Sequence, residues 1–226
     1  MKKYLKFLTL FLIIGFCLLY FCMDTSAPKV DYTAPKTVNE DTLGELRKNY
    51  NNSDIVGTLG IDGADINEVL VQYHDNKYYL THDLYKNHDI YGSVFLDYRC
   101  NKDSKKILIF GHNDFKEKTP FSNLENYEDP SYYKDHQFID VLIEDKKMKF
   151  QIFSVYIETS DFTYMNLKID DNKHGQDIIK YKSKSFYDTG VSVGLDDRIL
   201  ILQTCSNNAN YKKFNDKYLL IIAKLV

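Results

Sequence analysis

The sequence has no tryptophan, and its 226 residues include only 4 prolines, 10 glycines and 4 cysteines. It contains no G-x-x-x-x-G-K-[ST] or G-x-G-x-x-G element, which excludes the common glycine-rich phosphate-binding motifs. No group of histidines and cysteines has the spacing of zinc ligands, so we expect neither a metal nor another cofactor. The formal net charge is only -3, which gives no electrostatic reason to expect nucleic acid as a partner.

Long hydrophobic runs are scarce too, with one exception near the start of the chain. The uncharged segment Phe7–Met23 follows three lysines among the first six residues. The small residues Ser26 and Ala27 come soon after it, but no A-x-A cleavage signal is present. We therefore expect an uncleaved membrane anchor over residues 1–23 and an extracellular tether over residues 24–40. The lysines should stay in the cytoplasm, which sends the rest of the chain outside.

Two of the four cysteines, Cys17 and Cys22, fall in the apolar run, which leaves Cys100 and Cys205 for the rest of the chain. A disulfide between these two would close a loop of about 100 residues and stabilise the fold by up to ~5 kcal/mol. The alternative is that Cys205 is a free, reactive thiol, which exported proteins tend to avoid unless they use it. Spacing does not decide between these two interpretations.

The rest of the chain is rich in strand-forming residues. A short amphipathic helix is expected over residues 41–51, a second begins at Asp129-Pro130, and a third spans residues 175–187 with Ile178 and Ile179 on one face. Eight short strands in one domain, residues 41–226, favour a mainly β fold with a closed or nearly closed barrel. These predicted strands are Ile55–Ile61, Val69–Tyr73, Ser93–Leu96, Ile107–Phe110, Phe138–Ile143, Lys149–Ile157, Ile199–Thr204 and Leu219–Ala223.

Cys205 and His112 each follow an aliphatic strand and precede polar residues. Cys205 ends the run that starts at Arg198, and His112 follows Phe110 and a glycine. A thiol and an imidazole held at the ends of rigid strands can act as nucleophile and general acid/base. The alternative for Cys205 is a small buried hydrophobe. The other five histidines lie among charged or turn residues and are predicted to be solvated; they are His74, His82, His88, His136 and His174.

Four blocks of the sequence carry a resemblance to a known family. They are Asp75-Asn-Lys-Tyr-Tyr-Leu-Thr-His82, Tyr91-Gly-Ser-Val-Phe-Leu-Asp-Tyr-Arg99, Phe110-Gly-His-Asn113 and Leu202-Gln-Thr-Cys205. In this order and spacing, behind an N-terminal apolar run, the chain from about Ile55 to Val226 resembles the class B sortases, the membrane-anchored cysteine transpeptidases of Gram-positive bacteria.

The resemblance implies an eight-stranded β-barrel with a helix inserted near residues 175–187, Cys205 as nucleophile and His112 as general acid/base. It also implies the reaction: cleavage of a C-terminal sorting signal after its threonine through a thioester, and transfer of the protein to an amine. The implied partners are secreted proteins with a sorting motif, a peptidoglycan amine acceptor, and the membrane through the N-terminal anchor.

One departure from the family pattern concerns the last strand. The family has an arginine there that faces the thiol, whereas no arginine follows Cys205 in this chain. An ungapped alignment of the last strand puts Tyr218 in that position, with Lys217 beside it. Tyr218 could donate one hydrogen bond, and Lys217 would bring charge without the bidentate fork. The third role stays open between these two residues.

The resemblance further implies that Asn76, Leu80, Tyr164, Gln203 and Thr204 form the peptide groove, although Leu80 and Tyr164 could equally be core residues. Gln203 stands where the family usually has serine. Two alternative functions remain: a catalytically impaired peptide-binding domain, motivated by the missing arginine, and a hydrolytic cysteine peptidase on the same scaffold.

Overall fold

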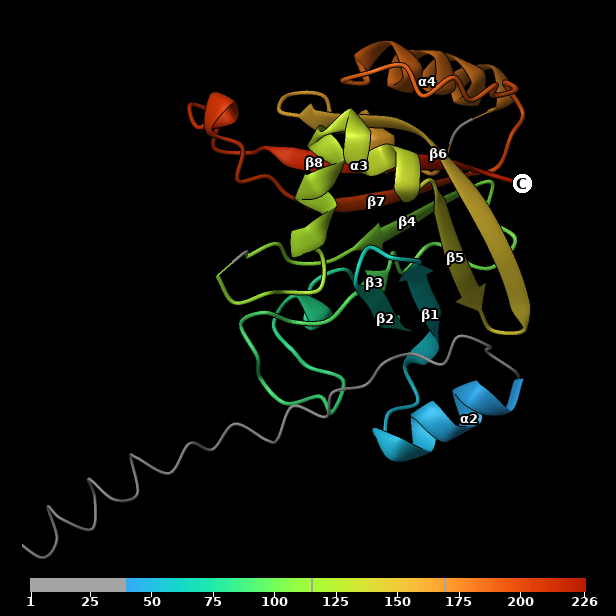
Figure 1. Ribbon diagram of the computed structural model, residues 1–226. Helices are drawn as coiled ribbons and strands as arrows, with labels where there is room; N and C mark the ends of the chain where they lie inside the picture. Colours follow the sequence, from blue (N-terminus) through green and yellow to red (C-terminus); the bar gives the residue numbers. More distant parts are fainter. Residues whose placement is uncertain (1–39, 115, 169) are drawn as a thin grey trace, which may run out of the picture. The chain divides into compact units, whose positions relative to one another are not determined.

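The computed structural model describes residues 40–226 except 115 and 169. In this part of the chain eight strands close a barrel (Figure 1) in the order β1-β2-β3-β4-β7-β8-β6-β5, and β5 pairs back with β1. The strands are β1 (Ile55–Ile61), β2 (Ile66–Val71), β3 (Phe95–Leu96), β4 (Lys106–Phe110), β5 (Phe138–Ile143), β6 (Lys146–Glu158), β7 (Ile199–Cys205) and β8 (Tyr218–Leu225). The predicted mainly β, eight-stranded barrel is therefore confirmed. Closure leaves no long sheet edge exposed for pairing with other chains.

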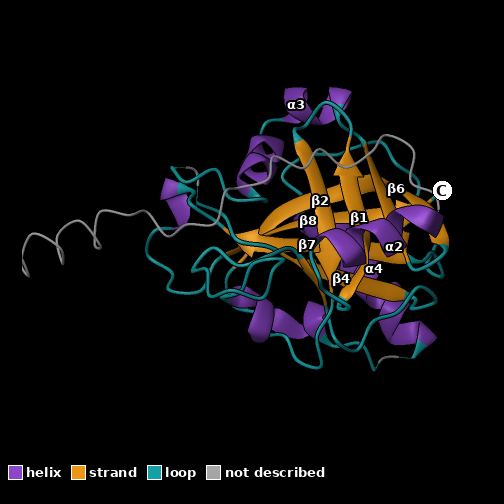
Figure 2. Ribbon diagram, turned by 90° about the horizontal axis from the view of Figure 1, so that it is seen from below, coloured by secondary structure: helices purple, strands orange, loops and turns teal. Residues whose placement is uncertain are grey.

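The strands β4 and β7 lie side by side in the barrel and run parallel, from Lys106↔Ile199 to Phe110↔Gln203. Both are unbroken aliphatic runs whose central residues are fully buried, as expected for strands covered on both faces. Because parallel neighbours end at the same edge, the residues that follow β4 and the last residues of β7 lie at one end of the barrel. Figure 2 shows long loops gathered beside the strands at this end.

Three α-helices surround the barrel in the described residues: α2 (Glu40–Asn49), α3 (Pro130–Asp135) and α4 (Asp171–Lys184). As predicted, Asp129 caps α3, its side chain accepting from the backbone N–H of Ser131. The helix α4 lies over β6 (Figure 1). Four short 3-10 helices, η1 (Tyr78–Leu80), η2 (Ser122–Glu128), η3 (Phe162–Met165) and η4 (Ala209–Tyr211), occur in the loops.

The helix α4 begins and ends earlier than the predicted range 175–187. It starts at Asp171 because the side chain of Asp170 accepts a hydrogen bond from the backbone N–H of Lys173 and so caps the first turn. It ends at Lys184 because Ser185 is extended, with φ -56° and ψ 138°, and its hydroxyl accepts from the backbone N–H of Val155. The helix therefore stops where the chain attaches to β6.

The prediction that His174 is solvated is wrong. This side chain lies on the inner face of α4, is only 1% exposed, and donates from Nε2 to the carbonyl of Asp197 at 2.8 Å. Burial lowers its pKa. The charged neighbours of His174 in the sequence suggested a solvated position. A helix can leave such neighbours exposed, however, while His174 lies on the face that is buried.

The predicted anchor and the predicted tether up to residue 39 lie outside the described residues. Among the helices of residues 40–226, apart from positions 115 and 169, none combines the length and the apolar character that crossing a bilayer requires.

Candidate active site

Cys205 is the last residue of β7 and is exposed as a free thiol. Its backbone carbonyl accepts a hydrogen bond from Asn113 Nδ2 at 2.9 Å, which fixes the strand end to the segment after β4. Partial burial raises the pKa of the Cys205 thiol. The positive charge of Lys217 lowers this pKa, and the negative charge of Asp216 raises it further. The thiol can therefore be reached from solvent, and neighbouring charges set how readily it ionises.

Cys100 is also a free thiol, but it is buried, and its sulfur lies 3.5 Å from the carbonyl oxygen of Lys106. Burial raises the pKa of this thiol to about 11. Of the two alternatives for the cysteines, the structure has the free thiols rather than the Cys100–Cys205 disulfide.

The register of β4 and β7 places His112 and Cys205 at the same end of neighbouring strands. Phe110 pairs with Gln203, and the N–H of Gly111 donates to the carbonyl of Gln203 at 3.2 Å. His112 stands two residues after Phe110 and Cys205 two after Gln203, so the two lie level at the ends of neighbouring strands. The imidazole Nε2 donates to the carbonyl of Leu80 at 2.8 Å.

The residue before His112 has to be glycine. A Cβ at Gly111 would lie 2.7 Å from the ring of Phe121, closer than real Cβ contacts. Phe121 is fully buried, and its N–H donates to the carbonyl of His112 at 3.1 Å. The close approach of this ring to the backbone therefore helps to fix the position of His112.

Tyr218 is the first residue of β8 and pairs directly with Cys205 in the antiparallel ladder of β7 and β8. Its ring meets that of Phe162 edge-on, with centroids 5.7 Å apart. Directly opposed residues in a ladder point to the same face, so Tyr218 shares the face of the thiol. The preceding residue, Lys217, uses its carbonyl to accept from the N–H of Ser206 at 3.0 Å.

The first three backbone amides after Cys205 each donate a hydrogen bond. Besides the Ser206 N–H, the N–H of Asn207 donates to the carboxylate of Glu125, and that of Asn208 donates to Ser206 Oγ at 3.1 Å. The side chain of Asn208 also donates to Glu128. The loop after the thiol is thus held against η2, and these three amides have partners already.

The family model described as the sortase domain matches residues 59–226. The chain belongs to the sortase family. It is 33% identical over 195 residues to sortase B of Listeria monocytogenes, an alignment that covers 84% of this chain and 78% of the relative.

Solved structures agree with this assignment. A Staphylococcus aureus sortase B–substrate complex has 29% sequence identity and a TM-score of 0.72, covering 83% of this chain and 85% of that one. Sortase B of Clostridium perfringens has 26% identity and a TM-score of 0.71, covering 81% of this chain and 98% of that one. This sortase is therefore of class B, a cysteine transpeptidase that acts on sorting-signal substrates and is associated with the cell surface.

The five residues predicted to form the peptide groove of this sortase differ in accessibility. Leu80 is 38% exposed, and Asn76 and Gln203 are half-buried. Asn76 is already engaged: Nδ2 donates to Asp97 Oδ2 at 2.8 Å, and Oδ1 accepts from the N–H of Tyr98 at 3.0 Å.

Tyr164 and Thr204 are buried. For Tyr164 this agrees with the alternative of a core residue, whereas Thr204 was expected in the groove. Thr204 is 2% exposed because it alternates with Gln203 and Cys205 along β7 and faces the barrel interior, where its hydroxyl donates to the carbonyl of Gly111 at 2.7 Å. Tyr164 is 0% exposed, and its hydroxyl donates to Gln203 Oε1 at 2.7 Å. Thr204 therefore ties β7 to the chain after β4, and Tyr164 holds the side chain of Gln203.

Asn113 and Glu125 were not singled out in the sequence, although both hold the backbone at Cys205. For Asn113 a signal existed, since it directly follows His112 at a predicted strand end. Glu125 gave none, because it lies 82 residues before its partner Asn207. The sequence pattern around Glu125 resembles that of any polar loop.

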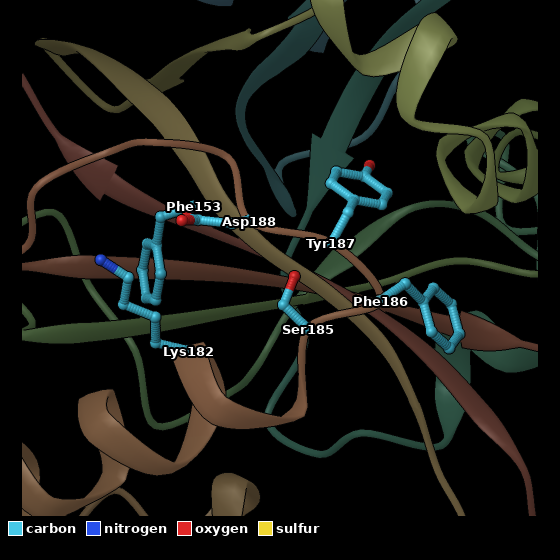
Figure 3. Close-up of a pocket in the computed structure, with 6 residues that line it drawn as sticks. All are labelled: Phe153, Lys182, Ser185, Phe186, Tyr187 and Asp188. Carbon is cyan, nitrogen blue, oxygen red and sulfur yellow. The ribbon is translucent and has the colours of Figure 1, made fainter.

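A separate cavity of about 440 Å³ lies at the C-terminal end of α4 (Figure 3). It is lined by Phe153, Lys182, Ser185, Phe186, Tyr187 and Asp188. None of the residues predicted for the active site lines it, so the chemistry at Cys205 does not involve this cavity. Within the described residues, no group of three or more histidine, cysteine or acidic side chains is arranged to hold a metal ion.

Proposed function

We propose that this sortase cleaves a C-terminal sorting signal after its threonine with Cys205 as nucleophile and His112 as general acid/base. The observation that supports the proposal is that both residues follow the paired parts of the neighbouring parallel strands β4 and β7 at the same end of the barrel, with Cys205 an exposed free thiol. Cys205 is held on a strand, and the hydrogen bond from the Gly111 N–H to the Gln203 carbonyl ties the chain before His112 to the same strand.

The reaction proceeds in two steps. The Cys205 thiolate attacks the threonine carbonyl, a C–S bond forms, and the C–N bond of the scissile amide breaks as His112 protonates the departing amine. In the second step an incoming amine attacks the thioester, His112 takes its proton, and the thiolate leaves. The histidine thereby returns to its starting state, and the protein is joined to the acceptor.

The hydroxyl of Tyr218 is the proposed donor to the oxyanion that develops in each step. Tyr218 occupies the position opposite Cys205, and the amides of Ser206, Asn207 and Asn208 are engaged elsewhere. Lys217 acts differently, since its charge lowers the pKa of the thiol without a hydrogen bond to it. In this way Tyr218 stabilises the transition state, and Lys217 favours the thiolate that begins the reaction.

The groove for the sorting signal is proposed to use Leu80, Asn76 and Gln203 as the accessible side chains, with Tyr164 and Thr204 supporting them. The acceptor is proposed to be an amine of peptidoglycan. A relative supports an amine acceptor, since a sortase B has been solved in complex with triglycine, with 29% identity and a TM-score of 0.73.

The proposed arrangement in the cell follows from the N-terminal sequence. Residues 1–23 anchor the protein as a single span with its N-terminus inside, residues 24–40 form the tether, and residues 41–226 form the extracellular catalytic domain. The lysines before Phe7 and the uncharged run up to Met23 support this orientation.

The missing arginine also favours a second candidate, a peptide-binding domain with little catalytic activity, and the same scaffold could serve a hydrolytic peptidase. One assay separates the three. A fluorogenic sorting-signal peptide is incubated with the protein, with and without an amine acceptor. Ligation that requires the amine supports the transpeptidase, cleavage that ignores the amine supports the peptidase, and binding without cleavage supports the binding domain.

A further inference from the structure

Three consecutive backbone carbonyls between β6 and α4 are held by two cationic side chains. Lys106 Nζ donates to the carbonyls of Tyr164 and Asn166, at 3.4 and 3.1 Å. Arg99 Nη2 donates to the carbonyl of Met165 between them, at 3.1 Å. We call residues 162–166 the η3 segment. Its backbone is thus fixed to β4 and to the chain after β3.

Each cation is anchored in turn by a buried carboxylate. Lys106 lies 3.2 Å from Asp177 of α4, and their side chains are 3% and 0% exposed. Arg99 forms two hydrogen bonds with Asp97, at 2.8 and 2.6 Å, and the Asp97 side chain is fully buried. Fully buried charges are rare unless they are paired. The carboxylates of Asp177 and Asp97 therefore keep Lys106 and Arg99 in place beside the carbonyls of the η3 segment.

Both carboxylates are ionised in the folded protein. Burial favours their neutral forms, but hydrogen bonds and charges from Lys173 and Lys106 keep the pKa of Asp177 below its ordinary value. In the same way the pKa of Asp97 stays low, because hydrogen bonds from Arg99 and Asn76 outweigh burial.

The η3 segment carries Tyr164, whose hydroxyl donates to Gln203 Oε1 at 2.7 Å. With its oxygen engaged, the amide of Gln203 has its NH₂ group left for another partner. Gln203 and Cys205 are two apart on β7 and therefore face the same side. For a sorting peptide that lies extended along β7, at about 3.3 Å per residue, the Gln203 amide is level with a peptide group about two residues from the bond under attack.

We propose that Lys106 and Arg99 are positioning residues for substrate recognition: they hold the η3 segment so that Tyr164 orients Gln203 to donate to a backbone carbonyl of the sorting peptide. This inference rests on the proposed function. It assigns the recognition to a hydrogen-bond donor, the Gln203 amide, and assigns the orientation of that donor to the buried Lys106–Asp177 pair and the half-exposed Arg99–Asp97 pair.

The test compares four changes in the protein. Lys106→Met/Asp177→Asn removes both charges of one pair, so that no unpaired charge is left buried. Arg99→Gln removes the other cation, and Arg99→Lys restores a positive charge there. Tyr164→Phe removes only the hydroxyl that engages Gln203. The matched control is Lys105→Met, since Lys105 pairs with Asp171 and Asp196 near the same helix but has no contact with the η3 segment in the hydrogen bonds described.

Two measurements are made on each variant. The substrate is the best-cleaved member of a fluorogenic peptide library in which the threonine is fixed. The first measurement gives kcat and KM of each variant for this peptide. The Kd of the same peptide is then measured with each variant in the Cys205→Ala background. We expect the double variant, Arg99→Gln and Tyr164→Phe to raise KM and Kd at least tenfold with kcat changed less than threefold. Arg99→Lys should recover part of the loss, and Lys105→Met should change neither constant.

The second measurement is amide hydrogen exchange of residues 160–168, which does not depend on activity. Exchange should quicken in the double variant and in Arg99→Gln, and stay unchanged in Lys105→Met. Unchanged exchange overturns the positioning role. Faster exchange with unchanged KM and Kd overturns the proposed effect of the η3 segment on peptide binding. The same conclusion follows if the Cys205→Ala protein binds no peptide of the library. If wild type binds peptides without cleaving them, the proposed function fails, and the Kd values still decide this inference.

Discussion

Tyr218 lies directly opposite Cys205 in the ladder of β7 and β8. A tyrosine cannot supply a fixed charge or a bidentate fork, but its hydroxyl can donate one hydrogen bond. The backbone amides after the thiol are engaged with Lys217, Glu125 and Ser206. A hydrogen bond from the Tyr218 hydroxyl would therefore stabilise an oxyanion at Cys205 without the fixed charge of an arginine.

Tyr218→Phe is expected to lower kcat at least tenfold and to change KM little. The variant removes only the hydroxyl and keeps the ring packed against Phe162. Loss of one oxyanion donor typically costs on the order of 10²–10³ in rate. The measurement is steady-state cleavage of the fluorogenic peptide. A Tyr218→Phe enzyme with near wild-type kcat would place the stabilising group elsewhere, for instance on Lys212 or Lys213 in the loop.

Lys217→Met and Asp216→Asn should shift the ionisation of Cys205 in opposite directions. Burial raises the pKa of the thiol, Lys217 lowers it and Asp216 raises it. Removing the lysine therefore raises the pKa, so less thiolate is present at neutral pH, and removing the aspartate does the reverse. The rate of alkylation by iodoacetamide should fall at least about twofold in the first variant and rise in the second, because the thiolate is the reactive form.

The pH dependence of that alkylation provides the control. The midpoint of the rate profile should lie above the ordinary thiol value in the wild type, higher still in Lys217→Met and lower in Asp216→Asn. Superimposable profiles for the three proteins would show that neither charge acts on the thiol.

The barrel could be predicted because its signals are local. Strands such as Ile199–Cys205 are aliphatic runs bounded by polar residues. All eight predicted strands are present: β1 and β5 have the predicted ends, and the other six have shifted ends. An ungapped alignment to the family pattern put Tyr218 opposite the thiol with Lys217 beside it, and the ladder pairs Tyr218 with Cys205.

What the sequence could not reveal depends on contacts between distant residues. Lys106 and Asp177 are 71 residues apart, and nothing near either of them indicates a buried pair. The burial of His174 depends on the Asp197 carbonyl, and that of Tyr164 on Gln203. Polar residues of this kind look solvated in sequence, because their partners are supplied only by the folded chain.

Cys205 is expected to be a free thiol in the active enzyme. In a chain that starts near Ser26, which lacks the two cysteines of the apolar run, iodoacetamide should label Cys205 without prior reduction. Cys205→Ala should abolish turnover. Cys100→Ala is the matched control: that thiol is buried and its pKa is raised to about 11, so it should react slowly and be dispensable for activity. Recovery of a Cys100–Cys205 disulfide peptide from active enzyme would refute this expectation.

The lysine-flanked run Phe7–Met23 is expected to hold the protein in the membrane. The full chain should therefore sediment with membranes and resist extraction by high salt, whereas the chain starting near Ser26 should stay in solution and cleave the same peptide. Native protein found mainly in the culture medium, with a new N-terminus near Ala27, would instead indicate a removed signal peptide.

His112→Gln is expected to separate proton transfer from thiol ionisation. The ring of His112 donates to the Leu80 carbonyl, and the charges that act on the Cys205 pKa are those of Lys217 and Asp216. Turnover should fall by roughly 10²–10⁴, the usual contribution of a general acid/base, because the leaving amine is no longer protonated. The pH profile of Cys205 alkylation should remain within about twofold of the wild type, since thiolate formation depends on other groups. An alkylation profile displaced as far as that of Lys217→Met would show instead that the imidazole is the cation that activates the thiol.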